Sequence, residues 1–178
     1  MLIYSYFYYT GKMSTIENSK IIVINKDDYT LKLYSYTGRL LNEYKVALGK
    51  NFGNKTEKGD NKTPEGVFNI QSIEDSSEWE YDFENDTLGP LKGAYGPWFI
   101  RLYIPGSKGI GIHGTLNNNS LGTRDSHGCI RIDSDSLKVL KSKISINTTV
   151  VIIPSSYDLL VNKDTTSIIE EMYSNRLK

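Results

Sequence analysis

Between residues 20 and 154 the chain alternates short runs of apolar and β-branched residues with clusters of Gly, Asn, Asp and Pro. Runs of this kind, bounded by turn residues, are typical of β-strands. Short polar turns join the first three runs, which predicts an antiparallel meander at the start of the fold. The predicted strands are residues 21–25, 29–36, 40–48, 67–73, 98–104, 109–113, 129–132 and 148–153.

Helical periodicity occurs in two places. Leu137, Leu140 and Ile144 recur at helical spacing after residues 133–135, whose polar side chains can cap a helix N-terminus. A weaker helix is predicted in the polar tail, around residues 168–172. No glycine-rich strand-to-helix loop with phosphate-binding spacing is present. The predicted fold class is therefore mainly β, with many short strands and one or two short helices.

Two segments between predicted strands have an unusual composition. Residues 49–66 contain four glycines and a proline, and the length of this loop favours a functional role over a plain connection. Residues 74–86 are acidic and aromatic, with Trp79, Tyr81 and Phe83. Two interpretations of this second segment are equally open: an insertion packed on the sheet, or part of a substrate groove.

Length and composition limit the class of protein. The 178 residues fit one domain with a short tail, and a hydrophobic content of 38% excludes a disordered chain. Lys plus Arg number 21 and Asp plus Glu also number 21, so the formal net charge is zero. This balance argues against a protein that binds nucleic acid or anionic lipid through bulk charge.

The chain divides into three parts by composition. Residues 1–19 form an apolar and aromatic N-terminal segment that is too short to span a bilayer. This segment is consistent with the remnant of an export signal, a lipid-surface anchor or a loose terminus. Residues 20–154 hold the predicted strands, and residues 155–178 form the polar tail.

The scarcest reactive side chains cluster in one short stretch. The single cysteine, Cys129, and both histidines, His113 and His127, lie between positions 113 and 129. A lone cysteine cannot form an internal disulfide, and three such residues cannot complete a zinc site of four Cys and His ligands. No metal site is predicted. Cys with His is the pair of nucleophilic thiol chemistry, and the competing interpretation is a small buried cysteine beside structural histidines.

Either histidine can serve the thiol. A free thiol with a pKa of about 8.5 is mostly protonated at neutral pH, and a nearby imidazole can take its proton. His127 lies two residues before Cys129 and shares its face if the backbone is extended. His113 ends a different predicted strand and can approach from the side. The spacing alone does not choose between the two.

Glycines beside these residues indicate close approach of the backbone. Gly128 allows a substrate carbonyl to reach the N–H groups of Gly128 and Cys129, which can then hold an oxyanion. The backbone carbonyl of Gly114 can orient His113, the role of a carboxylate in other triads. The motif thus contains the parts of a nucleophilic acyl-transfer site.

Charged residues flank the same stretch. Arg131 lies two residues after Cys129, so in a strand it faces the same side and can pair with a substrate carboxylate. An ordinary surface arginine is an equally good interpretation on spacing alone. Arg124 and Asp125 form a charged loop pair, which we expect to be solvated.

The segment from His113-Gly-Thr to Ser126-His-Gly-Cys-Ile-Arg131 resembles the signature of the L,D-transpeptidases with the YkuD catalytic domain. The opening strands and the segment Lys62-Thr-Pro-Glu-Gly-Val-Phe68 are similar to parts of the same domain. The resemblance covers about residues 20–154, which are expected to form the catalytic domain. It implies a β-sandwich-like domain of mixed sheets with a helix beside the catalytic strand.

The resemblance implies a reaction on peptidoglycan stem peptides. Cys129 would attack the carbonyl between the residue at position three and the terminal D-alanine, which gives a thioacyl-enzyme. An amine of another stem, or of a protein, would then accept the acyl group, giving a 3-3 cross-link or protein attachment. His113 would donate and accept the protons, oriented by the carbonyl of Gly114. No cofactor is expected.

The same resemblance assigns the residues around the thiol. His127 would shape the oxyanion region and the pocket, and Gly128 would supply an oxyanion N–H. Ser126 and Arg131 would lie near the substrate. The loop between His113 and Ser126 is short, so we expect a reduced lid over the site.

Two other functions remain open. An L,D-carboxypeptidase or endopeptidase on the same fold would use the same residues and pass the acyl group to water. A non-catalytic wall-binding domain would use none of them. The resemblance also implies carbapenem β-lactams as covalent inhibitors and an extracytoplasmic location, in the periplasm or cell wall, although the first residues predict no export signal. The oligomeric state is not predicted.

Overall fold

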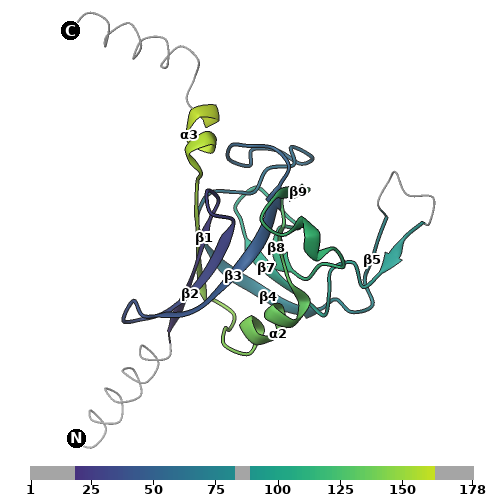
Figure 1. The fold of residues 1–178 in the computed structure, drawn as a ribbon, viewed down its shortest axis with the longest axis horizontal. Helices are drawn as coiled ribbons and strands as arrows, with labels where there is room; N and C mark the ends of the chain where they lie inside the picture. Colours follow the sequence, from purple (N-terminus) through teal and green to yellow (C-terminus); the bar gives the residue numbers. More distant parts are fainter. Residues whose placement is uncertain (1–18, 83–88, 163–178) are drawn as a thin grey trace, which may run out of the picture.

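The computed structural model describes residues 19–82 and 89–162, and strands account for most of its regular structure (Figure 1). In chain order the strands are β1 (Lys20–Asn25), β2 (Thr30–Ser35), β3 (Leu40–Gly49), β4 (Gly66–Asp75), β5 (Glu80–Tyr81), β6 (Leu91–Lys92), β7 (Trp98–Tyr103), β8 (Gly111–His113), β9 (Arg124–Ser126), β10 (Ile130–Ile132) and β11 (Thr149–Ile153). The helical elements are the 3-10 turn η1 (Asn118–Ser120), α2 (Ser134–Lys141) and α3 (Ser156–Asn162). The mainly β fold class is confirmed.

Most strands belong to one mixed, nine-stranded sheet in the order β10-β8-β7-β4-β11-β1-β2-β3-β9. β10 pairs in parallel with β8 and antiparallel with β3, so the sheet closes on itself. The β1–β2–β3 meander is antiparallel as predicted, whereas β1 runs parallel to β11. Closure gives the barrel-like or sandwich-like form expected from the resemblance. It also brings β8 and β10, which carry the predicted site, side by side.

Alternation along the strands explains which side chains fill the closed sheet. Ile22 and Ile24 of β1 and Leu31 and Leu33 of β2 are fully buried, and the residues between them are less buried. Successive side chains of a strand point to opposite faces, so each strand lends one face to the core. Each such side chain contributes roughly 1.5–3 kcal/mol by leaving water. All three residues of β8 are buried, so the core extends to the site.

Helix α2 begins with the cap that the sequence predicts. The Asp133 carboxylate accepts a hydrogen bond from the Ser136 N–H at 2.9 Å. Leu137 and Leu140 are fully buried in the core. The helix ends at Lys141, and Ile144 packs against the core from beyond it.

Several short elements are not predicted from the sequence. Strands β5, β6 and β9 have two or three residues each, too few for periodicity to reveal. Helix α3 lies in the segment interpreted as polar tail. The weak helix predicted around residues 168–172, Phe83 and nearly all of the N-terminal segment lie outside the described residues. Within the described ranges, no helix is long and apolar enough to cross a membrane.

A buried lysine organises the long loop of residues 49–66. The Lys26 side chain has no exposed surface, and its Nζ donates to the backbone carbonyls of Gly53 and Thr63. The same ammonium forms ion pairs with Glu65 at 2.6 Å and with Asp158 at 3.1 Å. The Lys26 ammonium therefore fixes the loop through an ion pair and through hydrogen bonds to two of its backbone carbonyls.

Asp158 of α3 lies at the centre of this cluster. Its buried carboxylate accepts hydrogen bonds from the N–H groups of Gly53 and Ser155 and pairs with Arg124 at 2.9 Å. The Arg124 guanidinium also donates to two carbonyl oxygens of the loop and lies 3.9 Å from the ring centre of Phe52. The cluster thus connects α3, the loop and β9, the strand that leads into the predicted site.

Candidate active site

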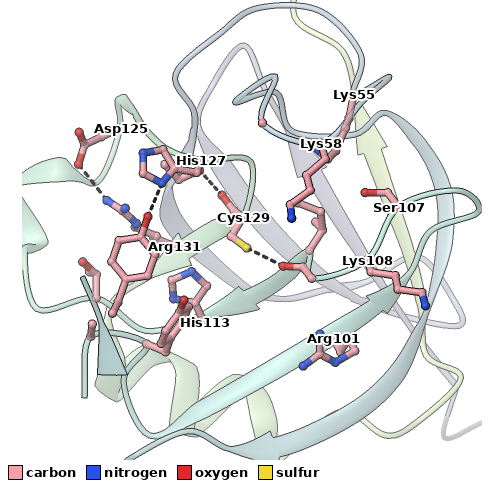
Figure 2. Close-up of a pocket in the computed structure, with 18 of the residues that line it drawn as sticks. Lys55, Lys58, Arg101, Ser107, Lys108, His113, Asp125, His127, Cys129 and Arg131 are labelled. Carbon is pink, nitrogen blue, oxygen red and sulfur yellow. Dashed lines mark hydrogen bonds and ion pairs between the residues drawn. The ribbon is translucent and has the colours of Figure 1, made fainter. Parts of the chain in front are cut away.

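The closed sheet brings the predicted nucleophile to the same pocket as both histidines. β8 and β10 run in parallel, with His113 at the end of β8 opposite Arg131 of β10. Cys129 directly precedes β10 and faces this pocket (Figure 2). The pocket has a volume of about 1080 Å³. The predicted site residues that line it are His113, Ser126, His127, Cys129 and Arg131.

The imidazole of His113 is buried and held in one orientation. It stacks on Phe99 with 5.6 Å between ring centres and meets the Tyr95 ring edge-on at 4.9 Å. Its Nδ1 lies 2.7 Å from the Gly114 carbonyl oxygen. A carbonyl only accepts, so Nδ1 carries the proton and Nε2 is the basic nitrogen. Burial lowers the pKa of His113 to about 4, so the ring is neutral at pH 7.

The thiol of Cys129 rests in its protonated form. The residue is half-buried, and its S–H donates to the Gly109 carbonyl oxygen at 3.4 Å. Burial raises the pKa of the thiol, and the Gly111 backbone and the charge of Arg131 offset part of this effect. The free site therefore holds a neutral thiol and a neutral imidazole. Proton transfer to His113 then has to accompany attack on a carbonyl.

A resting neutral thiol predicts a particular pH profile for alkylation. Because the thiolate is the reacting form, alkylation of Cys129 by iodoacetamide should be slow at about pH 7 and rise through about pH 9. The measurement is the rate of adduct formation against pH by intact mass spectrometry. A rate that already levels off below about pH 7 would instead indicate a thiolate–imidazolium pair in the free enzyme.

The backbone turns sharply between His127 and Cys129, so these side chains do not share a strand face. Gly128 has φ +121°, and a Cβ there would lie 2.8 Å from the Lys62 carbonyl oxygen. Only glycine fits this turn. The Gly128 N–H donates to Ser126 Oγ at 3.1 Å, and that hydroxyl donates to the Cys129 carbonyl. For the predicted oxyanion role, the Gly128 N–H has to leave this acceptor.

His127 is exposed at the rim of the pocket and meets the acidic, aromatic segment. Its Nδ1 lies 2.5 Å from the hydroxyl of Tyr81 in β5. Trp79, two residues earlier, packs against the aromatic rings that enclose His113. In the described part of this segment, Trp79 packs on the sheet, as expected for an insertion, and Tyr81 lines the pocket. A substrate groove that includes Tyr81 stays a prediction.

The charged residues beside the site form ion pairs with residues of other strands or helices. Arg131 lines the pocket and pairs with Asp125 at 2.9 Å. The Arg124 side chain is 6% exposed and pairs with Asp158 of α3. The expectation of a solvated pair is wrong for Arg124, which is buried against Asp158, whereas the Asp125 side chain is 44% exposed while it pairs with Arg131.

The two histidines should differ in their effect on the chemistry. We expect His113→Ala to lower kcat/KM for acyl transfer by about 10²- to 10⁴-fold, the usual contribution of a general base. His127→Ala should cost less, since His127 lies exposed at the rim. Steady-state kinetics of both variants, with melting temperatures as the control for folding, measures this difference. The reverse order would move the assignment of the base to His127.

A thiol beside an oriented, neutral imidazole is suited to attack on an acyl carbon. His113 and Cys129 both line this pocket, so Nε2 of His113 is the candidate acceptor of the thiol proton (Figure 2). Among residues 19–82 and 89–162, no group of three or more His, Cys, Asp or Glu side chains is arranged to hold a metal ion.

The closed mixed sheet and the pocket with a thiol and an imidazole define the class of protein: a β-domain with a candidate cysteine site. Comparison with known proteins identifies its family. A family model described as the L,D-transpeptidase catalytic domain, YkuD, matches residues 19–152. The chain belongs to this family.

Curated relatives carry the same family name. YbiS of Escherichia coli strain K12, named as a probable L,D-transpeptidase, is 33% identical over 78 residues, which cover 44% of this chain and 23% of YbiS. YqjB of Bacillus subtilis strain 168, whose name also places it among the L,D-transpeptidases, is 32% identical over 111 residues. That match covers 61% of this chain and 57% of YqjB. The chain thus spans about a quarter to somewhat over half of these relatives.

Solved structures show the same fold. Pgp2, the helical cell shape determining protein of Campylobacter jejuni, has a TM-score of 0.57 at 23% identity, covering 78% of this chain and 48% of Pgp2. An L,D-transpeptidase from Mycobacterium smegmatis has a TM-score of 0.57 at 19% identity, covering 76% and 58%. LdtMt1 in complex with imipenem has a TM-score of 0.56 at 22% identity, covering 76% and 59%.

Proposed function

We propose that this domain is a peptidoglycan L,D-transpeptidase in which Cys129 forms a thioacyl-enzyme with a stem tetrapeptide and passes the acyl group to an amine. The observation that carries the proposal is a pocket thiol beside a neutral imidazole whose Nδ1 is held by the Gly114 carbonyl. Membership of the L,D-transpeptidase family supports the substrate class. The proposed catalytic domain is residues 20–154, to which Asp158 anchors α3.

In the first half-reaction the Cys129 sulfur attacks the peptide carbonyl, and the thiol proton passes to Nε2 of His113. The oxyanion that forms needs N–H donors, a role we assign to the backbones of Gly128 and Cys129. The C–N bond then breaks, and His113 returns the proton to the nitrogen of the departing D-alanine. A thioester to Cys129 remains.

In the second half-reaction an acceptor amine attacks the thioester, and His113 takes the proton that the amine loses. The C–S bond breaks, the new amide leaves, and the proton returns to the sulfur. Burial, which lowers the pKa of His113 to about 4, favours this return because a weakly basic imidazole releases its proton readily. The thiol ends in the protonated form in which it began.

The size of the pocket favours an amine acceptor over water. Its volume of about 1080 Å³ lies slightly above the range of about 300–1000 Å³ that is usual for one small ligand. Two peptide chains that meet at Cys129 need such space, whereas a carboxypeptidase has to admit a single chain and water. An endopeptidase that cleaves a cross-link also has to admit two chains, and it is distinguished by its products. The proposed location is the periplasm or cell wall, where stem peptides occur.

Carbapenems are proposed as covalent inhibitors that acylate Cys129. The support is that LdtMt1, which has the same fold, is known in complex with imipenem. Intact mass spectrometry of the chain incubated with imipenem tests this directly. An adduct on the wild type that is missing from Cys129→Ala supports an acylating thiol, and the absence of any adduct favours a wall-binding domain.

The test of the proposed reaction is a mass-spectrometric analysis of muropeptides incubated with the enzyme. Tetrapeptide donors should yield 3-3 cross-linked dimers, and Cys129→Ala should yield none. Shortened monomers without dimers would contradict transfer to an amine and support the carboxypeptidase or endopeptidase alternative. Unchanged muropeptides with the wild type would contradict both.

A further inference from the structure

Positive side chains gather on one side of the pocket. Figure 2 shows them to the right of Cys129, away from the turn that carries His127 and from the Arg131–Asp125 pair. We call this set the cationic arm. Its members come from the loop of residues 49–66, from β7 and from the β7–β8 connection, and they are Lys55, Lys58, Arg101 and Lys108.

Two members of the cationic arm are fixed by carboxylates. Lys55 pairs with Asp60 at 2.7 Å, and both side chains are nearly buried. Arg101 binds Glu74 through two nitrogens at 2.7 and 2.8 Å. These pairs hold the two cations in place, and each carboxylate balances the charge of its partner. Neither cation therefore adds to the net positive charge of the pocket.

The other two members are not balanced in this way. Lys58 and Lys108 are exposed, and neither forms an ion pair with a residue that the structure describes. The chain as a whole has 21 basic and 21 acidic residues. Although the chain has no net charge, this end of the pocket therefore has a local excess of positive charge from two ammonium groups.

The two fixed members of the arm act on the reacting atom even though a carboxylate partner balances each of them. The charges of Lys55 and Arg101, together with that of Arg131, lower the pKa of the Cys129 thiol against the effect of burial. A concave pocket with low-dielectric walls focuses such a field and concentrates anions. An anionic group on a substrate therefore gains most when it lies between the arm and Cys129.

We propose that the cationic arm binds a free carboxylate of the peptide that reacts with Cys129, chiefly through Lys58 and Lys108. This proposal rests on the proposed function for the identity of the peptide. A stem peptide offers a carboxylate at its terminal D-alanine and can offer a second on its diamino acid. Ammonium groups recognise either as a point charge.

The direct test compares two alkylating agents that differ in charge. Iodoacetate is anionic and iodoacetamide is neutral, yet both react with the same thiolate, so the ratio of their rates cancels the thiolate fraction. In Lys58→Ala/Lys108→Ala the iodoacetate-to-iodoacetamide ratio at Cys129 should fall roughly fourfold at low salt. In the wild type the ratio should fall as salt rises, because ions screen exposed charges.

The matched control removes two lysines outside the pocket, Lys32 and Lys138, each of which forms a surface ion pair. Lys32→Ala/Lys138→Ala changes the net charge equally and should leave the ratio unchanged. An unchanged ratio in Lys58→Ala/Lys108→Ala, or an equal fall in the control, overturns the proposal. So does a salt-independent ratio in the wild type, a measurement that needs no variant.

Synthetic donors then identify the carboxylate. One donor has a carboxamide at its terminal D-alanine, and another has it on the diamino acid. The carboxylate that the arm binds is the one whose amidation raises KM in the wild type but not in Lys58→Ala/Lys108→Ala. Equal KM values for all donors in the wild type overturn the proposal. The alkylation ratio needs no turnover, so a lowered ratio in an enzyme that makes no cross-links contradicts the proposed function and leaves the anion site standing.

Discussion

Replacing Cys129 with alanine is expected to abolish acyl transfer and to leave the fold intact. The sulfur is the atom that carries the acyl group in the proposed reaction, and no other cysteine exists in the chain to replace it. Loss of a nucleophile of this kind lowers kcat by about 10⁴-fold or more. Alanine fits the half-buried position, so the free energy of unfolding should change by about 1 kcal/mol or less.

Dimer formation from tetrapeptide donors measures the activity, and urea unfolding measures the stability. Cys129→Ser is the conservative companion, since it keeps a hydroxyl in place of the thiol and should also be strongly impaired. Full activity in Cys129→Ala would show that the thiol is not the nucleophile. An inactive but unfolded variant would be recognised by its unfolding curve.

Asp158→Ala is expected to lower the free energy of unfolding by about 3–5 kcal/mol, the usual effect of removing one partner from a buried ion pair. The substitution leaves Lys26 fully buried and Arg124 nearly so, without the carboxylate between them. It also removes the acceptor of the Gly53 N–H, so the loop of residues 49–66 loses an attachment. Urea unfolding monitored by circular dichroism provides the measurement.

The matched control is Asp135→Ala, which removes an exposed carboxylate paired with Lys138. A surface pair of this kind contributes about 0–1 kcal/mol, so the effect should be small. Asp158→Asn removes the charge but keeps one acceptor oxygen, so its effect should fall between the wild type and Asp158→Ala. An effect of Asp158→Ala no larger than that of Asp135→Ala would contradict the structural role of the cluster.

The same carboxylate predicts a pH dependence. Burial alone would raise the pKa of Asp158, but hydrogen bonds from Ser155 and Gly53 and the charge of Lys26 outweigh it and lower the pKa to about 2. A lowered carboxyl pKa stabilises the native state above the unfolded value of about 4, and this contribution is lost as the pH falls toward about 2. The stability difference between the wild type and Asp158→Asn should therefore shrink between about pH 4 and pH 2.

Much of the fold could be predicted because its strands are long enough to show a pattern. The runs at residues 21–25 and 29–36 form strands as predicted, and the Asp133 cap has a local sequence pattern. Cys129 and His113 could be singled out because Cys and His are so rare in this chain. A helix cap and the rarity of Cys and His can both be recognised in the sequence without a structure.

The parts that could not be predicted depend on contacts between distant residues. Lysines are normally exposed, so the sequence gives no sign that Lys26 is buried. Its burial depends on Asp158 and on loop carbonyls that are distant in the chain. Arg124 was expected in solvent for the same reason. The cationic arm is assembled from three separate segments, and no spacing in the sequence signals that Lys58 and Lys108 line one pocket.

The closure of the sheet through β10 is a further long-range feature. Its three residues pair with both β8 and β3, which are far apart in the chain. This double pairing fixes the position of Cys129 relative to His113. Three residues carry too little pattern to predict which neighbours they join.

The most direct measurement is intact mass spectrometry of the acyl-enzyme. The full chain is mixed with a stem tetrapeptide, quenched with acid at short times, and digested to locate the modification. We expect a mass increase equal to the donor minus D-alanine, carried by Cys129 and absent from Cys129→Ala. Transfer of the acyl group to another residue, or an equal yield of products from Cys129→Ala, would contradict a mechanism that passes through this thiol.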